Sequence, residues 1–346
     1  MKKLYPVIAA LVMAAMSVPA CTPKTPDCSL PEVFCVGLVT DVGTIDDKSF
    51  NQSAWEGVRQ SETDGVAGWV EFIETADAKD YDGNIAAFAD AGYDVIVTVG
   101  SALGDATRAA AAAYPNTYFI GVDQFQADTI ANVAGLNFPE GRAGFLVGAL
   151  AAMMTATDKI GAVCGTDADP STWRYGEGYR AGAQYINPDI EVFVVYHSDV
   201  GFDQAFADPE WGAATADSMI DNGADVIFGA GGKTGSGAVT AAAQRGVYVI
   251  GANTDQYYSL PNAAPMLLSS AIKLISPGVA ELILAAGDAQ SGAGIFPAGN
   301  FMGDAGYAPY HDLEDRVPDD VRTRMAGISS MLLNGELTPD VSPFKP

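Results

Sequence analysis

An internal repeat constrains the fold of this 346-residue chain more than any other feature of its sequence. The stretch AGYDVIVTVGSALGDATRAAAAAYPNTYFIGVDQ, which begins at Ala91, is matched by NGADVIFGAGGKTGSGAVTAAAQRGVYVIGANTDQ, which begins at Asn222. Each copy contains a strand-like run, two glycines, an Ala-rich helical segment and a second strand-like run that ends in Asp-Gln. We therefore expect two similar α/β lobes, with the second lobe starting near residue 139.

Strand-like apolar runs alternate with helical segments along the whole chain, which predicts parallel sheets. The helices are expected at residues 50–62, 79–91, 102–113, 139–156, 208–222, 235–245 and 275–287, with a last one near 317–334. In open parallel sheets, ligands bind beyond the carboxyl ends of the strands. The fold class predicted is thus α/β, with two Rossmann-like parallel-sheet lobes, a hinge and an interlobe cleft that closes on a ligand.

The first residues have the pattern of an export signal. Two lysines precede a short apolar run, and the sequence Val-Pro-Ala-Cys at the end of this run resembles the lipobox of bacterial lipoproteins. This resemblance implies that residues 1–20 are a signal peptide and that Cys21 carries a lipid anchor. Residues 22–32 are a Pro-rich tether. The mature chain is then expected at the extracytoplasmic face of the cell membrane, although an ordinary signal peptide or an uncleaved anchor fits the same pattern.

Charge and residue usage argue against several classes of function. The formal net charge of −25 argues against a nucleic-acid partner, because binding a phosphate backbone needs a basic surface. The spacing of Cys28, Cys35 and Cys164 fits no zinc motif, and the sequence does not select a disulfide pair among them. The stretch GAGGKTGSG ends like a P-loop but has isoleucine, Ile227, where the first glycine is required. We expect no enzyme activity, no cofactor and no metal site.

Polar and aromatic residues gather where the predicted strands end, and this is where a ligand of such a fold would bind. Carboxylates at these positions can accept hydrogen bonds from hydroxyl or N–H groups, and aromatic rings can stack on a flat ligand. The pattern favours a neutral ligand with hydroxyl groups and an aromatic part. Single residues can also have a purely structural role: Asp46 can cap the helix that follows it, and Phe50 can pack in a core.

Four stretches resemble the basic membrane protein family of bacterial lipoproteins: DVGTIDDKSFNQSAWEGV, DVIFGAGGKTGSG, IGANTDQ and SSAIKLISPGV. The resemblance runs from about residue 33 to 334. It implies the type I periplasmic-binding-protein fold and an ABC transporter substrate-binding protein for purine nucleosides, with a permease as partner. It also implies a division of the chain, with residues 33–137 and 273–296 in lobe one and residues 138–272 and 297–346 in lobe two.

The resemblance further implies a set of ligand-binding residues. Phe50 and Phe206 would clamp the base, while Asn51 would contact its edge and Asp41 would bind near the base or the ribose. Asp123 and Asp255 would hold hydroxyls or base nitrogens from opposite lobes. The remaining members of the set are the backbone of Gly232, the ammonium group of Lys273 and the ring of Trp173, which would line the cleft.

The function predicted is delivery of a nucleoside, preferably a purine nucleoside, to a permease. Three alternatives stay open at this point. The first is a receptor for a sugar or a furanose-like signal, which would need fewer facing aromatic rings. The second is a nucleoside or glycoside hydrolase that uses the carboxylates. The third is a surface interaction protein such as an adhesin, which would need no closed cleft.

Overall fold

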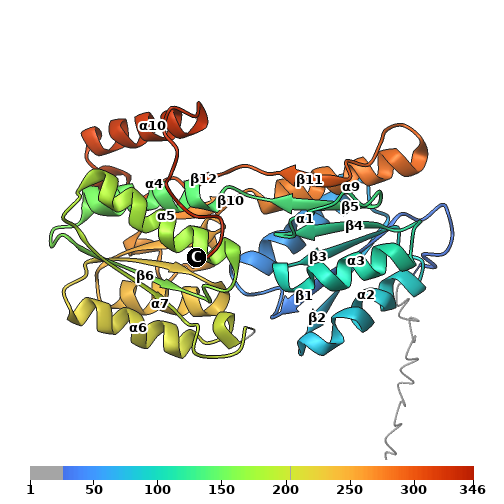
Figure 1. The fold of residues 1–346 in the computed structure, drawn as a ribbon, viewed down its shortest axis with the longest axis horizontal. Helices are drawn as coiled ribbons and strands as arrows, with labels where there is room; N and C mark the ends of the chain where they lie inside the picture. Colours follow the sequence, from blue (N-terminus) through green and yellow to red (C-terminus); the bar gives the residue numbers. More distant parts are fainter. Residues whose placement is uncertain (1–25, 203) are drawn as a thin grey trace, which may run out of the picture.

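The computed structural model describes residues 26–202 and 204–346, so the signal peptide and the predicted lipidation site Cys21 lie outside the described residues. Two α/β lobes lie side by side along the longest axis of the molecule (Figure 1). Each lobe contains a six-stranded sheet with a hydrophobic core on both of its faces. The predicted fold class of two parallel-sheet lobes is therefore confirmed.

Lobe one is built from two parts of the chain, one from β1 to β5 and one from α9 to β11. Its elements are β1 (Cys35–Val42), α1 (Phe50–Thr63), β2 (Trp69–Thr75), η1 (Ala78–Asp80), α2 (Tyr81–Asp90), β3 (Val95–Val99), η2 (Ser101–Leu103), α3 (Gly104–Ala113), β4 (Tyr118–Val122), β5 (Val133–Asn137), α9 (Ile275–Ser291) and β11 (Gly299–Met302). The strands follow the order β11-β5-β4-β3-β1-β2, and all neighbouring pairs are parallel. Helices α1 and α9 pack on one face of the sheet, while α2 and α3 pack on the other.

Lobe two repeats this plan and adds a C-terminal helix. Its elements are α4 (Glu140–Met154), β6 (Lys159–Cys164), α5 (Pro170–Ile186), β7 (Glu191–Tyr196), η3 (Gln204–Phe206), α6 (Pro209–Asp221), β8 (Val226–Ala230), α7 (Gly232–Gln244), β9 (Tyr248–Asn253), α8 (Gln256–Ser259), η4 (Ala264–Met266), β10 (Leu267–Lys273), β12 (Ala305–Tyr307), η5 (His311–Arg316) and α10 (Asp319–Leu333). The strand order is β12-β10-β9-β8-β6-β7, and only β12 runs antiparallel to its neighbour. The two sheets thus share one plan, as the repeat predicts.

Three short segments carry the chain between the lobes, at residues 138–139, 274 and 303–304. Backbone hydrogen bonds tie these segments together. The N–H of Leu274 donates to the Asp304 carbonyl at 2.9 Å, and the N–H of Gly303 donates to the Asn137 carbonyl at 2.8 Å. Because the lobes are joined here by a few adjacent residues, this bundle of crossings is the expected hinge.

The last boundary between the lobes needs a correction. The sequence places lobe two from residue 297 onward, but β11 pairs in parallel with β5 of lobe one. The chain therefore returns to lobe two only after residue 302. The boundary was predicted too early because β11 is a short edge strand, and the Pro and Gly residues around it are not typical of a strand.

Helix α5 is absent from the predicted helices because glycines interrupt its sequence. Its glycines lie against α4: a Cβ on Gly182 would be 1.9 Å from the Phe145 carbonyl oxygen, and one on Gly178 would be 2.6 Å from that of Gly141. The same holds for a glycine of α4: a Cβ on Gly148 would be 2.0 Å from the Tyr179 carbonyl oxygen of α5. The glycines that weaken the helix locally are thus required for the close packing of two helix backbones.

Cys28 and Cys35 form a disulfide, whereas Cys164 is free and buried. The bond fixes the start of the described chain to the first residue of β1. Among residues 26–202 and 204–346, no helix combines the length and the apolar composition that crossing a membrane requires.

Candidate functional site

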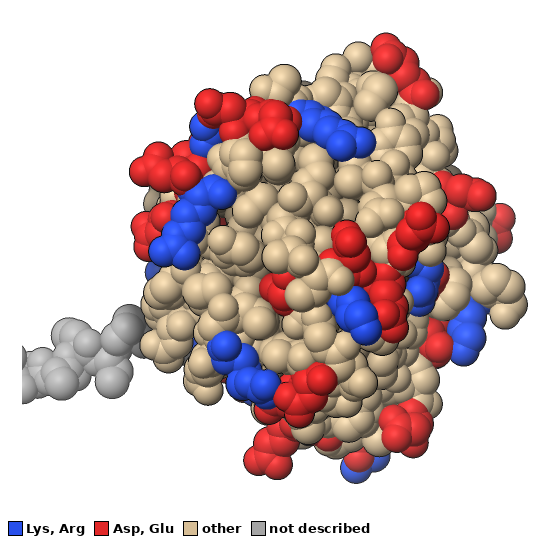
Figure 2. Space-filling view, turned by 90° about the vertical axis from the view of Figure 1, so that its left-hand side faces the viewer, with Lys and Arg blue, Asp and Glu red and all other residues tan. Residues whose placement is uncertain are grey.

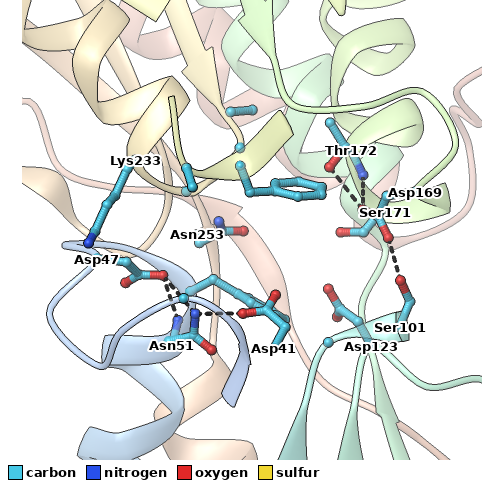
Figure 3. A pocket seen from close by; sticks show the side chains of 18 of the residues that line it. Asp41, Asp47, Asn51, Ser101, Asp123, Asp169, Ser171, Thr172, Lys233 and Asn253 are labelled. Atoms are coloured by element: carbon cyan, nitrogen blue, oxygen red, sulfur yellow. Dashed lines mark hydrogen bonds between the residues drawn. The ribbon is translucent and has the colours of Figure 1, made fainter. Parts of the chain in front are cut away.

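A cavity lies between the lobes, beyond the carboxyl ends of strands from both sheets (Figure 3). Its empty space is about 760 Å³, part of it open to solvent. Its lining from lobe one is Asp41, Val42, Gly43, Thr44, Asp47, Phe50, Asn51, Gly100, Ser101 and Asp123. Its lining from lobe two is Asp169, Ser171, Thr172, Tyr175, Phe202, Phe206, Ala207, Ala230, Gly231, Gly232, Lys233, Asn253 and Lys273. We call this space the interlobe cavity.

Glycines at the strand ends let backbone and side chains approach closely around the interlobe cavity. Gly100 has φ +107°, and a Cβ there would lie 3.1 Å from an oxygen of Asp41. Gly231 has φ +136° and would place a Cβ 2.4 Å from the backbone nitrogen of Gly165. The ring of Phe206 packs on Gly165 itself, where a Cβ would be 2.5 Å from a ring carbon. Side chains at these positions would therefore displace groups that line the cavity.

The carboxylate of Asp47 caps helix α1 and so positions Phe50 and Asn51. It accepts hydrogen bonds from the backbone N–H groups of Ser49, Asn51 and Gln52 at 2.8, 2.9 and 3.2 Å. Burial raises the pKa of Asp47, and these hydrogen bonds oppose that shift. The sequence suggested that Asp46 caps this helix, and the structure corrects this: the capping carboxylate is that of Asp47. Asp46 instead accepts a hydrogen bond from the hydroxyl of Thr44.

Asn51 lines the interlobe cavity, and the two ends of its side-chain amide differ in their partners. Its Nδ2 donates to Asp41 Oδ1 at 2.9 Å, as Figure 3 shows. Its Oδ1 is buried and has no hydrogen-bond partner among the described residues. A buried acceptor without a partner is costly, so this oxygen is an obvious place for a ligand donor.

Lys273, which lines the cavity, lies at the centre of a buried charge cluster. Its Nζ donates to Asp123 Oδ2 at 2.5 Å, to Ser171 Oγ at 3.0 Å and to Glu140 Oε1 at 3.4 Å. The ammonium also lies 4.8 Å from the centroid of the Phe50 ring. Because an ammonium has three donors, the protein itself satisfies Lys273. Its predicted contact with the ligand stays a prediction; within the protein its shortest hydrogen bond is the one to Asp123.

Asp123 combines a paired oxygen with a free one. Oδ2 accepts from Lys273, whereas Oδ1 is buried without a hydrogen-bond partner in the described part of the chain. Burial raises the pKa of Asp123 to about 6; the charge of Lys273 lowers it, and that of Glu140 raises it. Glu140, which is fully buried, is held in turn by Arg174, whose Nη2 lies 2.7 Å from its Oε2.

Two predicted residues lie outside the interlobe cavity. Asp255 caps α8 by accepting from the N–H of Tyr257, and its other oxygen lies 2.7 Å from His311 Nε2. The indole N–H of Trp173 donates to the carbonyl of Ser342 in the C-terminal segment at 3.2 Å. Both side chains are thus directed to partners within lobe two, although Asp255 occupies the position that Asp123 holds in the first repeat.

The structure brings the other seven predicted residues to the cavity and adds several that the sequence did not single out. Ser101 donates across the cleft to Asp169 Oδ1 at 2.7 Å, and Asp169 also caps α5 through Thr172 (Figure 3). Phe202 packs on Phe206, with ring centroids 5.3 Å apart. These residues lie in strand-end stretches that the sequence marked only as a whole. Asp169 stands directly before α5, and it was not singled out because no helix was predicted there.

Groups of three or more His, Cys, Asp or Glu side chains that could hold a metal ion do not occur among residues 26–202 and 204–346. On the end of lobe two that faces the viewer in Figure 2, acidic and basic side chains are intermixed, so this face presents no continuous basic surface.

Known proteins resemble this chain across both lobes. A family model described as Bmp, ABC transporter substrate-binding protein PnrA-like, matches residues 34–288. A CD4+ T-cell-stimulating antigen of Listeria monocytogenes is 30% identical over 328 residues, which cover 88% of this chain and 87% of that protein. The ABC transporter nucleoside-binding protein BmpA of Lactococcus lactis is 34% identical over 64% of each chain. The crystal structure of an ABC transporter solute-binding protein from Aeropyrum pernix K1 superposes with a TM-score of 0.75 at 25% identity, over 88% of this chain and 92% of that one.

Proposed function

The chain belongs to the Bmp family of PnrA-like ABC transporter substrate-binding proteins, and on this premise we propose that it binds a nucleoside, preferably a purine nucleoside, in the interlobe cavity and delivers it to a permease. A relative of this chain carries the name of a nucleoside-binding protein, which supports the choice of ligand class. The family also agrees with the sequence-based resemblance to basic membrane proteins.

The observation that carries the proposal is the pairing of aromatic rings with buried free acceptors in one cavity. Phe50 and Phe206 both line the space and provide faces on which a base can stack. Asn51 Oδ1 and Asp123 Oδ1 are buried acceptors without partners among the described residues. A ligand that satisfies all four must offer a flat ring together with hydrogen-bond donors, and a nucleoside supplies a base with N–H groups and a ribose with hydroxyl groups.

The charges around the cavity favour a neutral ligand over a phosphorylated one. Asp41, Asp123 and Asp169 all line the space, and the ammonium of Lys273 is already occupied by protein acceptors. A phosphate placed here would meet carboxylates, and Lys273 is already paired. The second cation in the described lining, Lys233, is close enough to Asp46 for its charge to lower the pKa of that carboxyl. We therefore propose discrimination against nucleotides.

The proposed cellular context follows from the N-terminal sequence. Acylation of Cys21 would hold the protein at the extracytoplasmic face of the membrane, next to the permease that receives the ligand. Closure of the lobes at the hinge would then be the state that the permease recognises.

A thermal-shift screen of residues 22–346 against adenosine, guanosine, inosine, adenine, AMP and ribose tests the proposal. A ligand that binds only the folded protein raises the unfolding midpoint by mass action. We expect shifts with purine nucleosides and none with AMP or ribose. A shift with ribose alone, or no shift at all, would contradict the nucleoside assignment; ribose alone would favour the sugar-receptor alternative.

Calorimetry on two aromatic variants tests the site. Removing a stacked ring costs about 1–3 kcal/mol per base, so Phe206→Ala should weaken nucleoside binding at least about fivefold. Trp173→Ala is the matched control, because that ring lies outside the cavity and should leave affinity unchanged. The reverse ranking of the two variants would refute the placement of the base.

A further inference from the structure

We propose that a second contact between the lobes, formed mostly by residues that do not line the ligand cavity, is a latch that sets how tightly the protein holds its ligand. The latch consists of Lys48 and Ser49 from lobe one, which meet lobe-two residues at the end of β9 and on α8: Ala252, Asn253, Gln256 and Ser259. The effect on affinity rests on the proposed function, whereas the effect on lobe closure does not.

Four hydrogen bonds form the latch. The carbonyl of Lys48 accepts from Gln256 Nε2 at 3.1 Å and from Ser259 Oγ at 2.8 Å. The hydroxyl of Ser49 donates to the Ala252 carbonyl at 3.2 Å and accepts from Asn253 Nδ2 at 2.9 Å. All four cross from one lobe to the other, so they exist only while the lobes are close together.

The internal repeat shows that this contact is a departure from the common plan. Gln256 corresponds to Gln124 of the first repeat, since each follows the aspartate at the end of its strand. The Nε2 of Gln124 donates to the Thr98 and Gly100 carbonyls, within lobe one. The Nε2 of Gln256 donates to Ser236 Oγ within lobe two and, in addition, to the Lys48 carbonyl of the opposite lobe. The same amide thus stabilises one lobe in the first copy and joins two lobes in the second.

Burial and backbone geometry show that the latch is a built contact. Ser49 and Gln256 are 2% and 1% exposed. Lys48 has φ +63° and Asn253 has φ +67°, and a left-handed conformation is unusual for a lysine. Such a backbone persists only where its surroundings hold it, and here the held carbonyl is the acceptor for two side chains of the other lobe.

The latch is separate from the ligand machinery in all but one residue. Asn253 lines the interlobe cavity, whereas Lys48, Ser49, Gln256 and Ser259 do not. These four are therefore positioning residues. If the ligand binds the closed form, the apparent affinity scales with the closed fraction, and each latch bond raises that fraction.

The experiment compares residues 22–346 with Ser259→Ala and Ser49→Ala. Ser259→Ala removes one interlobe hydrogen bond, which a half-exposed hydroxyl donates. Ser49→Ala removes two interlobe hydrogen bonds, and it does not weaken the start of α1 because the Ser49 side chain makes no capping hydrogen bond there. Ser259→Thr retains the hydroxyl. Ser291→Ala is the matched control, because its hydroxyl donates to a carbonyl within lobe one, that of Asp288 at 3.0 Å. Adenosine binding, dissociation rate, ligand-free radius of gyration and unfolding midpoint are measured for each.

We expect Ser259→Ala to weaken adenosine binding about two- to tenfold, mainly through faster dissociation, or to increase the ligand-free radius of gyration if the free protein is already closed. Ser49→Ala should act at least as strongly, while Ser259→Thr and Ser291→Ala should match the unmodified chain. Unchanged affinity together with an unchanged radius in both alanine variants would overturn the latch. So would a loss of affinity fully matched by a lower unfolding midpoint.

Failure of the proposed function is distinguishable from failure of the latch. If the unmodified chain binds no nucleoside, the function proposal fails and the ligand-free radius of gyration alone decides on the latch. A larger radius in the two alanine variants then supports it, and identical scattering curves overturn it.

Discussion

Replacing Lys273 by methionine should destabilise the protein strongly, because it leaves a buried carboxylate without its partner. The side chain of Lys273 is 1% exposed, and those of Asp123 and Glu140 are 7% and 0% exposed. Glu140 keeps its pair with Arg174, so the uncompensated charge is that of Asp123. Removal of one partner from a buried pair typically costs about 3–5 kcal/mol, and we expect a loss of this size in the free energy of unfolding near pH 7.

Urea unfolding at pH 7.5 and pH 5 measures this loss and its pH dependence. Burial already holds the pKa of Asp123 at about 6, above the value of an unfolded aspartate. Such a group stabilises the folded state at acid pH, and this stabilisation is lost as the pH rises from about 4 through 6. Removal of the ammonium raises the pKa further, so Lys273→Met should lose less stability at pH 5 than at pH 7.5.

Two comparisons make the reasoning falsifiable. The double variant Lys273→Met with Asp123→Asn carries no unpaired charge and should recover much of the loss. Lys345→Met is the matched control: its ammonium lies 2.6 Å from Asp167 but is 53% exposed, so its removal should change stability little. A loss below about 1 kcal/mol for Lys273→Met, or no recovery in the double variant, would refute the account of the cluster.

Other parts of the structure support three more predictions. Gly182→Ala should lower the free energy of unfolding by about 1–3 kcal/mol, because its Cβ would lie 1.9 Å from a backbone carbonyl oxygen of the facing helix. Gly327→Ala is the control: position 327 in α10 has open space around it, so this change should be neutral or stabilising in the same urea titration. Nucleoside affinity should fall between pH 7.5 and pH 5, since protonation of Asp123 removes an acceptor, and Asp123→Asn should flatten this profile in calorimetry; an unchanged slope would contradict the assignment. Reduction of the Cys28–Cys35 disulfide, or Cys28→Ser, should cost about 2 kcal/mol for a loop of sequence separation 7, and an unfolding midpoint insensitive to reductant would argue against it.

Much of the architecture could be predicted because local patterns encode it. The repeated succession of strand, glycine turn and Ala-rich helix predicts two lobes, and the predicted helix at 139–156 closely matches α4. Helix α5 was missed because its glycines lower helix propensity, and only the neighbouring α4 backbone explains them. Strand β11 was missed because four residues at a sheet edge leave almost no periodic signal.

The candidate site shows the same limit at the level of single residues. Asp123 and Asp255 stand at equivalent points of the repeat, yet one faces the cavity beside Lys273 and the other pairs with His311 on the outside. Nothing within either repeat distinguishes them, since the partners come from distant segments. Trp173 was misplaced for a related reason, because its partner is the C-terminal segment.

The two-lobed α/β fold, the strand ends at which a ligand would bind and the family of the chain can all be inferred from the amino-acid sequence alone. They depend on hydrophobic periodicity and short motifs, which neighbouring residues define. Which polar groups meet depends instead on the folded arrangement of the whole chain. Lys273 and Asp123 are 150 positions apart, and Ser259 and Lys48 are 211 apart. Their contacts depend on how the two sheets are placed across the hinge, and a local sequence pattern does not encode that placement.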